Sequence, residues 1–167
     1  MSLIVEDGTG VINANAYISL AEFKAYASAR FIDIDDFEND QINGAIVIAS
    51  VDFISVNYDF KGIALTEDQG MALPTDKVGI NSDIKIATYQ ATMLSLNGRL
   101  FVDTTELSVN GAISSESKGV GSLSKSVEYS EDGRKYTSKY PTTNIDERLS
   151  SYLSGGGGYA PDKSLRY

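Results

Sequence analysis

Hydrophobic residues recur at intervals of three and four in three stretches of the first hundred residues, and each stretch predicts an amphipathic helix. The first spans about Leu20–Ala29 and begins at a Ser19-x-x-Glu22 capping box. The second spans about 40–58 and the third about 83–97, with Asn81 or Ser82 as its N-cap. We expect these helices to form the core through the apolar positions Leu20, Phe23, Ala27, Ile42, Ala45, Ile46, Ala49, Phe53, Val56, Ile84, Ala87, Ala91 and Leu94.

The segments between the predicted helices are polar or irregular. Residues 2–10 indicate a short extended segment closed by a glycine-containing turn, and Thr66 is placed to cap a short helical turn. Asp33, Asp35, Asp36, Glu38 and Asp40 form an acidic connector. We interpret this connector as a solvated loop and helix start, and not as a metal site.

Beyond Phe101 the pattern changes. Residues 104–126 are rich in Ser, Gly and Asn, which favours long exposed segments. Alternating residues over 123–130 and 134–140, separated by Asp132-Gly133, then predict a β-hairpin. Asn144 can cap a last helix over about 145–153, and Gly155–Gly158 form a flexible joint.

These elements predict a mostly α (α+β) fold, a small helical bundle with a projecting β-hairpin. One domain would span residues 1–153, with a helical core over about 19–100, the hairpin over about 122–140 and the last helix over about 145–153. Residues 154–167 would form a flexible Gly-rich C-terminal arm.

Composition argues against an enzyme. The 167 residues include no cysteine and no histidine, which excludes disulfides, the commonest zinc and iron–sulfur ligands and every Cys- or His-based catalytic triad. Ser115-x-x-Lys118 lies in a low-complexity stretch, and the glycines at 119–121 and 155–158 lack the other residues of a phosphate-binding loop. We therefore expect no catalytic residues, no cofactor and no metal.

The formal charge is −9, and residues 1–100 carry 14 acidic against 6 basic side chains. Such a surface repels a phosphate backbone, so we do not expect the protein to grip nucleic acid over its whole surface. No apolar run reaches 18 residues, and we expect no association with a membrane.

The predicted hairpin carries tyrosines interleaved with basic residues: Lys125, Tyr129, Arg134, Lys135, Tyr136, Lys139 and Tyr140. Tyrosine and arginine are favoured at protein contacts, so Tyr129, Arg134, Tyr136 and Tyr140 are candidate interface residues. The same side chains could instead be ordinary cross-strand pairs of an exposed hairpin, or a platform on which single-stranded bases stack. The net charge ranks these three interpretations in that order.

Several strings together carry a family resemblance. They are Leu3-Ile4-Val5-Glu6-Asp7-Gly8-Thr9-Gly10, Asn13–Ser19, Thr66–Pro74 with Val78-Gly79-Ile80, and Ile84–Gln90. This chain resembles the head–tail connector (adaptor, head-completion) proteins of tailed bacteriophages over most of its length. Some members of that family carry the label of a primosomal DnaT-like single-stranded-DNA-binding domain.

The resemblance implies a structural protein of the phage neck. It would form a ring, of twelve copies, under the portal, extend the DNA channel and join the head to the next neck or tail-completion protein. Genomic DNA would pass without specific binding, and assembly would take place in the host cytoplasm before the protein resides in the virion. The alternative function is a single-stranded-DNA-binding module.

The resemblance also implies a role for the arm. In related connectors the C-terminal segment engages the portal. Here the joint would be Gly155–Gly158, and the contacts to the portal or a neighbouring copy would come from Tyr159, Leu165, Arg166 and Tyr167.

Overall fold

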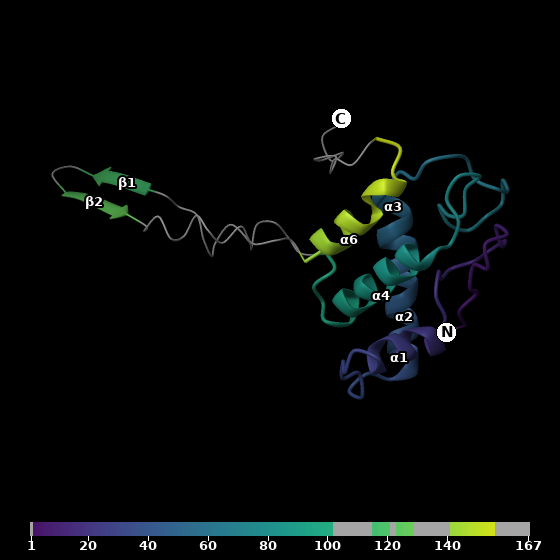
Figure 1. Ribbon diagram of the computed structural model, residues 1–167. Helices are drawn as coiled ribbons and strands as arrows, with labels where there is room; N and C mark the ends of the chain where they lie inside the picture. The colour runs from purple at the N-terminus through teal and green to yellow at the C-terminus, as the bar shows by residue number, and fades with distance from the viewer. Residues whose placement is uncertain (1, 102–114, 121–122, 129–140, 156–167) are drawn as a thin grey trace. The chain divides into compact units, whose positions relative to one another are not determined.

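The computed structural model describes residues 2–101, 115–120, 123–128 and 141–155 (Figure 1). The chain divides into two compact units. The first, the helical body, comprises Met1–Leu100 and Pro141–Tyr167, and the second comprises Phe101–Tyr140. The described part is mainly helical, which confirms the predicted fold class at that level.

Two of the predicted helices form with their predicted caps. Helix α1 is Leu20–Ser28, and the amide of Glu22 donates to Ser19 Oγ while the amide of Ser19 donates to Glu22 Oε2. Helix α4 is Ser82–Leu96, and Asn81 Oδ1 accepts from the amides of Asp83 and Ile84. Side-chain caps satisfy amides that have no partner within the helix, so these short motifs fix where each helix starts.

The second predicted helix is continuous but not uniform. It begins as α2 (Asn39–Val47), widens into the π-helix η1 (Ile48–Ile54) and ends as α3 (Ser55–Asn57). The amide of Ser55 bonds the carbonyl of Ser50, five residues back. The wider turn changes the angular position of the residues after it, and Val56, which we expected to face inward, is 74% exposed. The prediction for Val56 is therefore wrong, whereas Phe53 is buried as expected.

Two smaller predictions also need correction. Thr66 does not cap a helical turn, because Gln69 Oε1 closes the loop by accepting from the amides of Leu65 and Thr66. The last helix, α6, is Thr143–Leu149, followed by the 3-10 turn η3 (Ser150–Tyr152), so it starts before Asn144.

The core of the helical body gathers around α4, which packs against α2, η1 and α6 (Figure 1). One cluster of fully buried side chains joins the first segment to α1 and α2, and its members are Ala16, Ile18, Phe23, Ile42 and Ile46. A larger cluster includes Phe53, Leu73, Ile84, Ile145 and Leu149. Leu94 and Leu20, which we expected to be buried, are only partly buried, Leu94 against this cluster and Leu20 against the first. The burial of Ile145 and Leu149 makes α6 part of the core.

The first segment is organised by a buried carboxylate. Glu6 is 3% exposed, and its Oε1 accepts from the amides of Gly8 (2.9 Å) and Gly10 (3.0 Å) while Oε2 accepts from Val11 (2.8 Å). Both glycines have positive φ, +101° and +80°, a region that side chains disfavour. The predicted glycine-containing turn is thus present, and it closes around Glu6.

The second unit contains strands β1 (Ser115–Val120) and β2 (Leu123–Glu128), which pair antiparallel from Ser115↔Glu128 to Val120↔Leu123. Strand β2 overlaps the predicted strand 123–130, but its partner comes from the Ser/Gly-rich stretch in which we expected no strand. The other predicted strand, 134–140, lies outside the described residues, so its pairing across Asp132-Gly133 stays a prediction.

Candidate interaction surface

Most residues that we predicted from the sequence to contact a partner lie outside the described ranges. These are Tyr129, Arg134, Tyr136 and Tyr140 of the hairpin and Gly158, Tyr159, Leu165, Arg166 and Tyr167 of the arm. Gly155 is described, is exposed, and a Cβ added to it would meet nothing within 4 Å. The described site is therefore the surface from which the arm departs.

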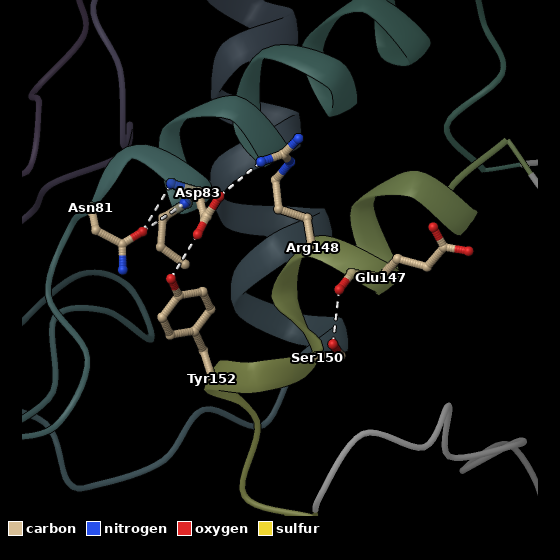
Figure 2. Close-up of polar contacts among 7 residues, drawn as sticks. Asn81, Asp83, Glu147, Arg148, Ser150 and Tyr152 are labelled. Carbon is tan, nitrogen blue, oxygen red and sulfur yellow. Dashed lines mark hydrogen bonds and ion pairs between the residues drawn. The ribbon is translucent and has the colours of Figure 1, made fainter.

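A carboxylate on α4 holds the segment that precedes the arm (Figure 2). Asp83 Oδ1 accepts from Arg148 Nη1 and Asp83 Oδ2 accepts from the Tyr152 hydroxyl, each at 2.7 Å. The hydrogen bond from Tyr152 and then the Arg148 guanidinium lower the pKa of Asp83 below its ordinary value. The same bond to Asp83 raises the pKa of Tyr152. Asp83 thus joins the first turn of α4 to both α6 and η3.

Backbone contacts fix this segment further. The amide of Lys61 donates to the carbonyl of Tyr152 (2.9 Å), and the amide of Ser154 donates to the carbonyl of Asp59 (2.9 Å). The Tyr58 hydroxyl donates to Asp146 on α6. The chain is therefore tied to the helical body up to Ser154.

A groove runs along α4 beside α6. One hollow, of about 480 Å³, is lined by Asp83, Gln90, Asn144, Glu147 and Arg148. A second, of about 400 Å³, is lined by Tyr26, Ile32, Gln90, Met93, Leu94, Asn97, Arg99, Pro141, Asn144 and Ile145. Gln90 and Asn144 line both hollows, so the two form one groove, polar at the Asp83 end and mainly apolar at the Met93 end.

Two polar atoms beneath this groove are buried without a hydrogen-bond partner among the described residues. They are Gln90 Oε1, an acceptor, and Arg148 Nε, a donor. Buried polar groups are almost always satisfied in folded proteins, so this pair next to the groove is a candidate contact for a bound partner.

Arg99 and Pro141 lie on opposite sides of the second unit in the sequence, yet both line this groove. The chain therefore leaves the helical body and returns to it at the same place.

An aromatic and cationic stack lies on α1 and α4. The Tyr26 and Tyr89 rings stack with centroids 4.4 Å apart, and the Arg30 guanidinium lies 3.8 Å from the Tyr26 centroid. Partial burial, followed by the nearby Glu22 carboxylate, raises the pKa of Tyr89. Such stacks are used both at protein contacts and under nucleic-acid bases.

The net negative charge of the protein lies in the described part of the helical body. Its described residues, 2–101 and 141–155, include 16 acidic and 7 basic side chains, a net of −9. The rest of the chain, with 7 of each, is neutral. Within the described ranges, no three Asp or Glu side chains are grouped to hold a metal ion, and no helix is long and apolar enough to cross a bilayer.

Sequence reasoning missed the groove and its residues. Asp83 and Arg148 are 65 positions apart, and neither stands in a recognisable motif. Helical periodicity was the only sequence signal in this region. It predicted which residues of α4 face the core, and Gln90 was not among them.

A family model described as "Putative DnaT-like ssDNA binding protein" matches residues 1–166, and the chain belongs to this family. No curated protein and no solved structure gives a significant match. The match confirms the DnaT-like label that the resemblance included, and it does not by itself assign a role in a virion.

Proposed function

We propose that this chain is a structural head–tail connector protein of a phage neck. Copies would form a ring under the portal, extend the DNA channel and bind the next neck or tail-completion protein. The observation that carries the proposal is the charge of the described part of the helical body, −9 with 16 acidic side chains. A wall of this sign suits a channel, because duplex DNA can slide past it without sticking.

The way the chain leaves the body supports the same proposal. Arg99 and Pro141, which flank the second unit in the sequence, both line one groove of the helical body, and the anchored segment of that body ends at Ser154. Extensions rooted in a folded body are suited to contacts with neighbouring copies, and many symmetric copies compensate for the entropy of ordering them.

Native mass spectrometry tests the proposal on the full-length protein, alone and mixed with the portal protein encoded by the same phage genome. We expect a closed ring, of twelve copies by the resemblance, either alone or on the portal. A protein that stays monomeric and does not bind the portal would overturn the connector role.

The alternative function is single-stranded DNA binding, which the family description favours. The specific observation on its side is the Arg30–Tyr26–Tyr89 stack, since bases stack on tyrosine and arginine faces. Fluorescence anisotropy with a labelled oligo-dT strand separates the two functions. A connector should bind no tighter than the non-specific range of roughly 10⁻⁴–10⁻⁶ M at physiological salt.

Submicromolar binding with a steep salt dependence would instead support the alternative. That affinity should then fall on Tyr26→Ala if the stack is the site, or on Tyr136→Ala if the hairpin is the site.

A further inference from the structure

We propose that the groove between α4 and α6 is a peptide-binding site whose ligand is the segment Tyr159–Tyr167 of a neighbouring copy. This inference rests on the proposed connector role, since it requires copies that stand side by side. The sequence analysis predicted which residues of the arm make contacts, but it did not predict the surface that they bind. This inference identifies that surface.

The unsatisfied atoms beneath the groove match the chemistry of a peptide group. Gln90 Oε1 can accept one hydrogen bond and Arg148 Nε can donate one. A backbone peptide unit offers one N–H and one C=O, the two kinds of partner that these atoms lack. Asp83 already engages Nη1 of Arg148, which leaves Nε for the ligand.

The dimensions of the groove agree with a short extended segment. The groove follows α4 from Asp83 to Asn97, about 21 Å at a helical rise of 1.5 Å per residue. Nine extended residues span about 30 Å at roughly 3.3 Å each, which is sufficient to cover it. The apolar end, with the partly exposed Met93 and Leu94, offers contacts for the side chains of Tyr159, Leu165 and Tyr167.

Charge favours the same ligand. Residues 156–167 contain two basic side chains, Lys163 and Arg166, and one acidic side chain, Asp162. The described part of the helical body carries −9. Opposite net charges speed the encounter and reduce the cost of bringing the two surfaces together.

The four glycines indicate that the groove belongs to a neighbour. Tyr152 is bonded to Asp83, so the arm starts close to the polar end of its own groove. A tight turn into that groove would need only about two linker residues. Four residues, Gly155–Gly158, can span up to about 13 Å when extended, which suits a crossing to an adjoining copy.

Disulfide trapping in the full-length protein tests this inference, because the chain has no cysteine of its own. Asn144 lines both hollows and is exposed, and Ser164 lies near the middle of the segment. The two positions should therefore come close together whichever way the segment runs along the groove. Chains carrying Asn144→Cys are mixed with chains carrying Ser164→Cys and oxidised. The matched control replaces Asn144→Cys with Val56→Cys, an exposed position on α3.

We expect the Asn144–Ser164 disulfide between chains to form at least fivefold above the Val56 control. Adding Gln90→Leu to the Asn144→Cys chain should reduce trapping to the control level. The same change should leave the melting temperature unchanged or higher, because it removes a buried unsatisfied acceptor. A merely structural role for Gln90 would lower the melting temperature instead.

Two results would overturn the inference. One is trapping at the control level. The other comes from a third sample, a chain that carries both Asn144→Cys and Ser164→Cys: a disulfide that forms within this chain, but not between the mixed chains, would mean that the segment occupies its own groove. Native mass measured on the same samples separates the two proposals: a ring without trapping contradicts the groove assignment alone, whereas a monomer that ignores the portal contradicts the connector role as well.

Discussion

The hydroxyl of Tyr17 lies 2.8 Å from Ser55 Oγ, and this contact joins the first segment of the chain to the end of the π-helix. Ser55 Oγ donates to the carbonyl of Ser50 (2.8 Å), so Tyr17 is the donor toward Ser55. The Tyr17 oxygen in turn accepts from the amide of Leu73 (3.2 Å). Three segments far apart in the sequence therefore share one buried hydrogen-bond network, and each polar atom in it has a partner.

This network predicts a dependence of stability on alkaline pH. Burial raises the pKa of Tyr17 to about 12, although the contact with Ser55 and the hydrogen bond from the Leu73 amide lower it in part. The neutral phenol is thus favoured in the folded state, so its stabilisation is complete below the ordinary pKa near 10 and is lost as the pH rises toward 12. Unfolding should become easier by up to about 1.4 kcal/mol per pH unit in that window through this residue.

Tyr17→Phe should lower the free energy of unfolding at pH 7 by about 1–3 kcal/mol, because the amide of Leu73 loses its acceptor. It should also make the decline above pH 10 shallower. Urea titrations at pH 7, 10 and 11 measure both effects. Wild-type and variant curves that fall in parallel above pH 10 would contradict the assignment.

Phe53 and Val56 provide a matched pair on the second helix. Phe53 is 7% exposed and meets the Tyr58 ring edge-on, with centroids 5.7 Å apart, whereas Val56 is 74% exposed. Phe53→Ala should cost about 3–5 kcal/mol, the range for a large aromatic removed from a core. Val56→Ala should change stability by less than about 0.5 kcal/mol. Equal costs in a denaturant titration would mean that the helix packs through another face.

The contrast between these two residues shows what the sequence can predict. Capping residues act over three or four positions, so Ser19 with Glu22 and Asn81 located two helix starts correctly. The π-turn ends at Ser55, whose side chain forms hydrogen bonds with Ser50, Tyr17 and Ala72. Contacts with distant segments such as Tyr17 and Ala72 leave no trace in the helical periodicity, so the sequence pattern did not predict the π-turn. The groove depends on Asp83 meeting Arg148 and Tyr152, contacts that exist only once α6 returns to α4.

Asp83 and Tyr152 predict an effect at acid pH. The lowered pKa of Asp83 means that its ionised form is favoured in the folded protein, so this stabilisation is present above its ordinary pKa of 3.8 and is lost as the pH falls. Tyr152→Phe removes the largest cause of the shift and should raise the pKa of Asp83 toward 3.8. Carboxyl-carbon NMR titration of Asp83 measures the change. An unaltered pKa would assign the shift to Arg148 alone.

Phe31 predicts a substitution that stabilises the protein. It follows α1 with φ +54°, and the amide of Ile32 reaches back to the carbonyl of Ala27, the arrangement in which helices usually end on glycine. Its side chain is 98% exposed, so the left-handed backbone strain is not offset by burial. Phe31→Gly should relieve about 1 kcal/mol of strain and raise the melting temperature by about 2–4 °C.

Asn13 is the control for this prediction. It is also exposed and has φ +61°, but asparagine tolerates the left-handed region, so Asn13→Gly should gain clearly less. Differential scanning calorimetry of both variants beside the wild type measures the difference. A lower melting temperature for Phe31→Gly would contradict the prediction, because it would mean that the Phe31 ring packs against the rest of the protein in solution.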